Sequence, residues 1–195
     1  RFGRALAVTH AAGAPAFGSP PPERDDDGFI GPIPLPHNHS QPALGWGSFF
    51  ARYRLEPFAR AARDRQALSP SGAAAVDRVC ARLADGDEEL CGPPEPPARL
   101  HGDLWSGNVL WDDDGAVLID PAAHGGHRES DLAMLALFGL PHLRRVLDAY
   151  HELAPLACGW RDRVELHQLF PVLVHAALFG PGYGAQAAAI AQRYA

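Results

Sequence analysis

The 195-residue sequence is 47% hydrophobic and 21% charged, a balance that lets one globular unit bury a proper core. Its formal net charge of −6 at pH 7 leaves no basic footprint, which argues against a nucleic-acid partner. No run of about 18 apolar residues occurs, so the sequence predicts no membrane span.

The first 45 residues predict a short helix followed by a long irregular segment. Residues 2–12 have an amphipathic pattern that Gly13 and Pro15 bring to an end. Residues 13–45 are rich in proline and glycine and predict an irregular excursion over the surface. Within it, the acidic run 25–27 is typical of a solvated turn.

A pair of histidines, His37 and His39, lies in the same segment with one residue between them. Such an H-x-H pair is compatible with zinc, but the sequence shows no third ligand nearby. We therefore interpret the pair as part of a loop that faces substrate or solvent.

The rest of the chain predicts mostly helix. A helix over residues 46–68 should bend or break near Pro57, and Ser69 before Pro70 is typical of the start of another, over residues 71–83. The prolines of 93–97 indicate an extended approach to the next motif. The last helices are expected over residues 129–137, 141–153, 161–179 and 185–194.

One β-hairpin is expected within residues 100–134, where the motifs of the chain gather. Two short apolar runs, 109–111 and 116–119, flank the turn sequence Asp112-Asp113-Asp114-Gly115. Asn108 precedes the first run and Asp120 ends the second. A hairpin would therefore place Asn108 and Asp120 side by side.

The sequence His101-Gly102-Asp103 with Asn108 five residues later has the spacing that phosphoryl transfer from ATP requires. Asp103 suits the base that aims the acceptor hydroxyl, while Asn108 and the strand-terminal Asp120 suit magnesium ligands. Alone, an H-G-D sequence is typical of a turn with a capping aspartate. Together with the hairpin and Asp120, it indicates a catalytic loop and a metal loop.

The motifs closely resemble those of the fructosamine kinase, or ketosamine-3-kinase, family. The resemblance is carried by residues 100–108, by Ile119-Asp120-Pro121-Ala122 and by Gly126-His127-Arg128-Glu129-Ser130-Asp131-Leu132-Ala133-Met134, and it extends to residues 29–36 and Tyr183. Aminoglycoside and choline kinases share H-x-D-x-x-x-x-N but typically not L-W-S-G-N.

The resemblance implies an α+β, protein-kinase-like fold in which ATP binds between a small β-rich N-lobe and a larger helical C-lobe. The N-lobe contributes a lysine to the phosphates, yet this sequence contains no lysine. We expect residues 1–195 to form a single C-lobe, mostly helical with one or two small β-hairpins, with the N-lobe absent. Alone, it should be inactive, and it could self-associate through the surface left by the missing lobe.

Residues around the motifs have expected roles, some implied by kinase-like folds and some by their own chemistry. His101 is expected to buttress the loop and Asp131 to accept hydrogen bonds from its backbone, both as structural residues. Arg128 could contact phosphate, but we favour the interpretation that it holds Glu129 or Asp131 in place. Trp105 could stack on a substrate sugar or amine, or pack under the loop.

The resemblance implies ATP and Mg²⁺ as cofactors and a ketosamine, free or on a protein lysine, as the substrate phosphorylated for deglycation. An aminoglycoside or choline kinase, and a non-catalytic binding module without the N-lobe, stay open as alternatives. A metal-dependent phosphohydrolase is disfavoured because the motif lacks a hydrolase's metal cluster. Cys80, Cys91 and Cys158 suit free thiols in a reducing cytoplasm.

Overall fold

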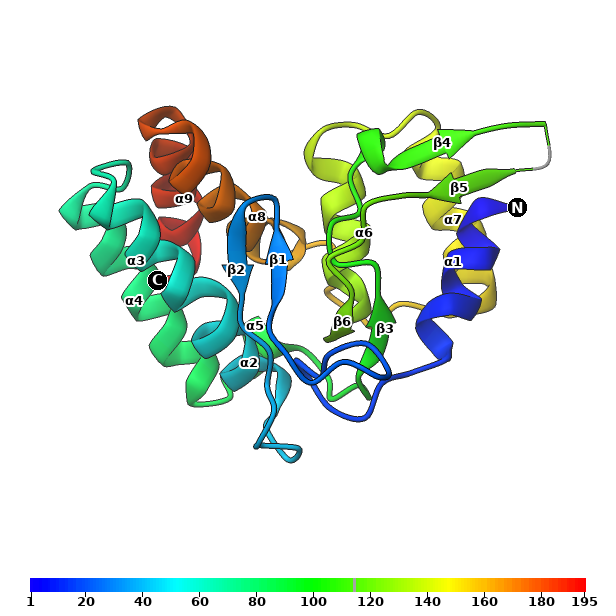
Figure 1. Ribbon diagram of the computed structural model, residues 1–195, viewed down its shortest axis with the longest axis horizontal. Helices are drawn as coiled ribbons and strands as arrows, with labels where there is room; N and C mark the ends of the chain where they lie inside the picture. The colour runs from blue at the N-terminus through cyan, green and yellow to red at the C-terminus, as the bar shows by residue number, and fades with distance from the viewer. Residues whose placement is uncertain (114) are drawn as a thin grey trace. The chain divides into compact units, whose positions relative to one another are not determined.

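The computed structural model describes residues 1–113 and 115–195 (Figure 1). Asp114, part of the predicted turn, lies outside the described residues. The chain divides into two compact units, the first formed by residues 1–42 and 95–164 and the second by residues 43–94 and 165–195. Among the described residues, no helix is both long enough and apolar enough to cross a membrane. That the whole chain corresponds to one kinase-like lobe remains a prediction.

The described residues of the first unit form three α-helices, one 3-10 turn (Ser106–Asn108) and three small antiparallel sheets (Figure 1). The sheets pair β1 with β2, β3 with β6, and β4 with β5. In chain order the elements are α1 (Phe2–Ala11), β1 (Gly28–Ile30), β2 (Ile33–Leu35), β3 (Ala98–Leu100), β4 (Val109–Trp111), β5 (Ala116–Leu118), β6 (His124–Gly126), α6 (Arg128–Leu137) and α7 (Leu143–Leu153).

The core of this unit lies where α1 packs against α7 and where both meet residues of α6. Leu104, from the loop between β3 and β4, is fully buried in this core, and Val109 at the start of β4 joins it. Burying one such aliphatic side chain stabilises the fold by about 1.5–3 kcal/mol. The loop that carries Asp103 is therefore anchored on the core on one side and on the hairpin on the other.

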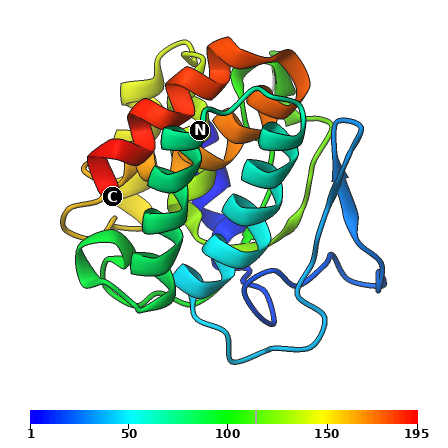
Figure 2. The ribbon, with the colours of Figure 1, turned by 90° about the vertical axis from the view of Figure 1, so that its left-hand side faces the viewer.

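The second unit is helical throughout its described elements, and Figure 2 shows α3, α4 and α9 packed together. Ser69 caps α4, with its Oγ accepting a hydrogen bond from the Gly72 N–H at 3.1 Å, as Ser69-Pro70 predicts. The helices are α2 (Trp46–Phe49), a π-helical segment (Phe50–Leu55), α3 (Glu56–Asp64), α4 (Pro70–Ala84), α5 (Glu88–Cys91), α8 (Val164–Phe179, whose first residue ends the first unit) and α9 (Pro181–Tyr194).

The helix predicted over residues 46–68 has no break at Pro57, because α2, the π-helical segment and α3 follow one another without a gap from Trp46 to Asp64. The change from π-helix to α-helix falls between Leu55 and Glu56, just before Pro57, and the last residues of the predicted range lie beyond the end of α3. The π-helical form itself has no signal in the sequence.

The prediction that residues 13–45 are irregular throughout was wrong in part. β1 and β2 form a hairpin in this segment, with Gly28 opposite Leu35 and Ile30 opposite Ile33. Its strands have three residues each, too few for an alternating pattern to stand out. The β3–β6 sheet was also missed, because it pairs segments that lie far apart in the sequence.

Candidate active site

The predicted hairpin is confirmed, with Val109 opposite Leu118 in the β4–β5 register. The pairing continues one step further, since the Ile119 N–H donates to the Asn108 carbonyl at 3.1 Å. Asp120 follows Ile119 directly, is exposed, and has a left-handed φ of 51°. This φ is unusual for a residue other than glycine, and aspartate is among the side chains that tolerate it. The structure thus brings Asn108 and Asp120 to the same end of one hairpin.

Asn108 is bound to Asp103 through its amide nitrogen. Its Nδ2 donates to the Asp103 carbonyl at 2.8 Å and to the Asp103 Oδ2 at 3.2 Å. The Asn108 side chain is buried, whereas Asp103 is half-buried. Since the amide nitrogen faces Asp103, the amide oxygen is the group with which Asn108 can bind a cation.

His101 connects the loop of Asp103 to the strand before Asp120. Its Nε2 lies 2.9 Å from the Ile119 carbonyl, which can only accept, so Nε2 carries the proton. Its Nδ1 accepts a hydrogen bond from the Asp103 N–H at 3.3 Å. Both ring nitrogens are therefore engaged in hydrogen bonds that hold the loop.

Asp131, in the first turn of α6, receives the backbone of the same loop. Its Oδ2 accepts from the His101 N–H at 2.8 Å and its Oδ1 from the Gly102 N–H at 3.0 Å. His10, on α1, lies 3.2 Å from Oδ2. Burial opposes ionisation of Asp131, but the hydrogen bond with His10 and the neighbouring donors outweigh it, so its pKa is lowered.

Gly102 cannot be replaced by a larger residue without disturbing this loop. Its φ is +82°, and a Cβ added to it would lie 2.1 Å from the Ala122 carbonyl oxygen. Glycine is therefore required here both for the backbone conformation and for the close approach of the chain after Asp120.

Sequence reasoning missed two residues behind Asp131. The His10 Nδ1 lies 2.8 Å from the Tyr150 hydroxyl, so α1 and α7 both contribute to the support of the loop. Burial raises the pKa of Tyr150 to about 12, although the charge of Arg128 acts in the opposite direction. The sequence did contain a signal for this support. His10 lies on the apolar face of α1 beside Leu6 and Ala7, where a buried polar side chain needs a hydrogen-bond partner.

The partner expected for Arg128 was wrong. Its guanidinium binds Glu95 through two hydrogen bonds of 2.5 and 2.6 Å, and it also donates to the carbonyls of Ala154 and Pro155. Glu129 is held instead by Arg163, at 2.6 and 3.0 Å. The physical reasons are that Glu129, as the next residue on the helix, does not face Arg128, and that the Asp131 carboxylate is already bonded to the loop backbone. Glu95 and Arg163 are distant in sequence from α6, and no local pattern pointed to them.

Trp105 is 39% exposed and follows Asp103 by two residues. A Cβ on Gly107 would lie 2.2 Å from a carbon of its ring, so the indole covers Gly107. Its ring also meets the Phe138 ring edge-on, with centroids 6.0 Å apart. The side chain thus packs partly against its own loop while it presents part of its surface to solvent.

The residues at the end of the hairpin are suitable ligands for Mg²⁺. Mg²⁺ prefers oxygen donors and is usually held by one or two carboxylates, with waters and substrate phosphates as the other ligands. The Asp120 carboxylate and the Asn108 amide oxygen are donors of this kind, and the exposure of Asp120 leaves room for the remaining ligands.

The chain is thus helix-rich α+β, and its H-x-D-x-x-x-x-N loop is hydrogen-bonded through His101 to Ile119, the residue before Asp120. The model of the family described as fructosamine kinase matches residues 1–195. The chain therefore belongs to the fructosamine kinase family.

Known proteins agree with this assignment. The chain is 36% identical over 184 residues to a "Probable ketoamine kinase" of Enterococcus faecium, covering 93% of this chain and 62% of the relative. It is 37% identical over 142 residues to the "Ketosamine-3-kinase" of Mus musculus, covering 71% of this chain and 43% of the relative.

A solved structure from Thermobifida fusca, provisionally named fructosamine-3-kinase, superposes with a TM-score of 0.87 at 55% identity. The match covers 98% of this chain and 64% of that one. The chain spans about three-fifths of the length of the curated relatives it matches first.

Proposed function

We propose that this chain carries the catalytic and metal-binding residues of an ATP-dependent kinase that phosphorylates the sugar of ketosamines. The observation that supports this most strongly is the pairing of Asp103 with Asn108, joined through His101 to the strand before Asp120. The family of the chain and the names of its relatives favour a ketosamine as acceptor.

In this proposal Asp103 accepts the proton of the acceptor hydroxyl and aims its oxygen at the phosphorus atom. The Asn108 amide, bonded to one carboxylate oxygen, fixes the orientation of Asp103. His101 and Asp131 act on the backbone of the loop and keep Asp103 in position. Both are positioning residues, since they touch the loop and not the reacting atoms.

Asn108 and Asp120 are the residues that would hold magnesium. Mg²⁺ and ATP, when bound, supply the phosphoryl group and neutralise the charge that develops on it. Trp105 stands two residues after the base with part of its indole exposed, which suits stacking on a sugar face or on a cationic amine.

We also propose that these residues correspond to the C-lobe of the kinase-like fold and that the chain by itself turns over slowly. The support is compositional, since the sequence contains no lysine to orient the phosphates. A location in the cytoplasm and self-association remain predictions, the second of which size-exclusion chromatography tests.

The experiment is an ATP turnover assay with Mg²⁺ and three acceptors: fructosyl-lysine, an aminoglycoside and choline. The proposal expects phosphorylation only of fructosyl-lysine, at a low rate for this chain alone, and loss of that rate in Asp103→Asn. Preference for another acceptor would contradict the substrate class. Turnover that survives in Asp103→Asn would contradict the role of the base, and fast turnover would contradict the C-lobe proposal.

A further inference from the structure

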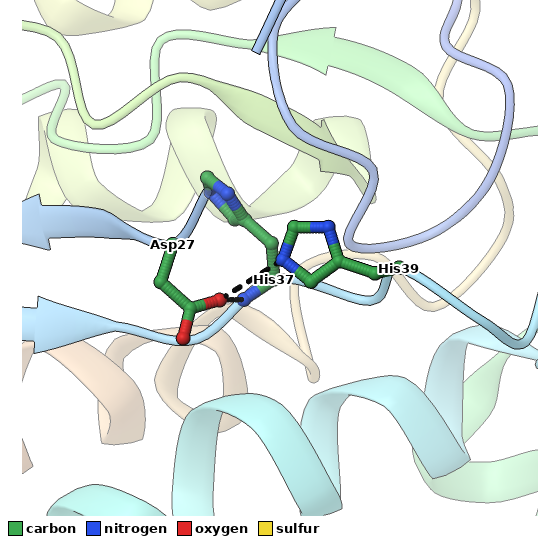
Figure 3. Close-up of side chains that lie close together, drawn as sticks. All are labelled: Asp27, His37 and His39. Atoms are coloured by element: carbon green, nitrogen blue, oxygen red, sulfur yellow. Dashed lines mark hydrogen bonds and ion pairs between the residues drawn. The ribbon is translucent and has the colours of Figure 1, made fainter. Parts of the chain in front are cut away.

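The β1–β2 hairpin brings together three side chains that are scattered in the sequence. Asp27 immediately precedes β1, and His37 and His39 follow β2 after Pro36. Because the hairpin reverses the chain, Asp27 lies next to the two histidines. It is the third possible metal ligand that the sequence around His37 and His39 did not show. One atom able to bind a metal from each residue lies within 4.8 Å of the others (Figure 3).

Asp27 already binds both histidine residues through one oxygen. Its Oδ1 accepts from the His37 backbone N–H at 2.8 Å and lies 3.1 Å from the His39 Nε2 (Figure 3). The carboxylate is thus fixed between the His37 backbone and the His39 imidazole. The side chains of His39 and Asp27 are 39% and 53% exposed, so both retain freedom to adjust.

The His37 ring is buried and held in one orientation. Its Nδ1 lies 3.1 Å from the Asp26 carbonyl, and because a carbonyl can only accept, Nδ1 carries the proton. The lone pair of the ring is therefore on Nε2. Histidines that bind metals characteristically donate their other ring N–H to a backbone carbonyl or a carboxylate in this way.

The backbone between the two histidines is also fixed. Asn38 donates from Nδ2 to the carbonyls of Phe17 and Gln41, and its Oδ1 accepts from the Gln41 N–H. Its own N–H donates to the Gly18 carbonyl at 2.8 Å. Four hydrogen bonds on this one residue hold His37 and His39 at a set separation, as a preformed site requires.

We propose that Asp27, His37 and His39 form a binding site for a divalent transition metal of the zinc class. Two imidazoles and one carboxylate are ligands that suit Zn²⁺, Co²⁺ and Ni²⁺, whereas Mg²⁺ prefers an all-oxygen shell. Donor atoms around a tetrahedral Zn²⁺ are about 3.3 Å apart, given Zn–N distances of about 2.0–2.1 Å. Small movements of the exposed His39 and Asp27 side chains bring the group to that spacing.

Access to this site is provided by a pocket of about 440 Å³. Asp27 and His37 line one part of it, and Pro121 and Ala122, which directly follow Asp120, line another. A water can enter from the pocket as the fourth ligand, which leaves the site with three protein ligands and one open position. The bound metal would fasten the loop of His37 and His39 to the start of β1 beside the segment that follows Asp120.

The proposal is independent of the proposed kinase function, and metal binding itself tests it. The purified chain, freed of any histidine tag, is titrated with Zn²⁺ in a calorimeter, and with Co²⁺ while visible absorption is recorded. We expect one equivalent to bind, and Co²⁺ to give the absorption bands of a site with nitrogen ligands. Absence of saturable binding overturns the proposal.

Two pairs of variants make the test specific. His39→Asn and Asp27→Asn each remove one exposed ligand and should weaken Zn²⁺ binding at least about 10-fold. The matched controls are His142→Asn, an exposed histidine on another loop, and Asp26→Asn, which removes the same charge from the neighbouring position. Both should bind as the unmodified chain does. Unchanged Zn²⁺ binding in His39→Asn, or an equal loss of binding in the controls, overturns the assignment. The test needs no substitution of the buried His37.

Discussion

Asp131 Oδ2 lies 2.8 Å from the backbone nitrogen of His101, thirty residues earlier in the chain. The carboxylate is 1% exposed, so this hydrogen bond forms away from water and is charge-assisted. This hydrogen bond fixes His101, two positions before Asp103. The position of the proposed base therefore depends on α6, which carries Asp131. The arrangement explains why a buried charge is kept in the core of the first unit.

The substitution Asp131→Asn should destabilise the chain by about 2–3 kcal/mol, because hydrogen bonds to an ionised carboxylate are replaced by weaker neutral ones. Urea unfolding followed by circular dichroism measures the change. The control is Asp77→Asn, whose carboxylate is 60% exposed and lies 3.8 Å from Arg63. A loss no larger than that of the control would contradict the role given to Asp131.

The stability that Asp131 contributes should depend on pH with a definite sign. Its pKa is lowered on folding, so the contribution is present above about pH 4 and is lost as the pH falls through the pKa of the folded state. We expect acid unfolding of the original chain to be steeper than that of Asp131→Asn. Parallel acid limbs for the two proteins would show that Asp131 is not ionised in the fold.

Asp103→Asn should lower turnover by at least about 100-fold in any active preparation, while nucleotide binding stays nearly unchanged. A base acts on the transition state and contributes little to binding of the ground state. The measurement is kcat together with the Kd of Mg²⁺–ATP from fluorescence. Comparable losses in kcat and in binding would assign Asp103 to the metal site instead.

Asp120→Ala should weaken nucleotide binding, and only when Mg²⁺ is present, because the substitution removes the one carboxylate proposed to hold the metal. Titration of ATP with and without Mg²⁺ separates the two contributions. Asp113→Ala, which removes an exposed carboxylate from the turn of the same hairpin, is the control and should bind as the original chain does. Equal effects of the two substitutions would point to the overall charge of the hairpin as the cause.

The three cysteines are free thiols, as expected from the sequence, and should differ widely in reactivity. Burial raises the pKa of Cys80 to about 12, whereas Cys158 is exposed. A thiol reagent at pH 8 should modify Cys158 in a fast phase and Cys80 only after unfolding in guanidinium. Cys158→Ser should remove the fast phase, and a fast phase that persists would contradict the burial pattern.

The parts of the site that the sequence predicted are those determined by local chemistry. The hairpin around Asn108 and Asp120 follows from two apolar runs and a turn rich in aspartate and glycine, all within twelve residues. The cap at Ser69 likewise depends on neighbouring residues alone. These features needed no knowledge of how distant segments pack.

The parts that could not be predicted depend on packing between distant segments. Arg128 binds Glu95, thirty-three positions away, and His10 reaches Asp131 across 121 positions. Asp27 comes to His37 and His39 only because two three-residue strands pair, and such strands are too short to show a periodic pattern. In each case the residue type indicated a need for a partner, but several partners were chemically acceptable.

Three residues in the first turn of α6 hold four other segments of the first unit. Arg128 holds the segments at Glu95 and at Ala154, Glu129 holds Arg163, and Asp131 holds the loop of His101. Unwinding this one turn would release all of these segments together. Their backbone amides should therefore exchange with deuterium at a common rate, as a single cooperative unit that opens as a whole.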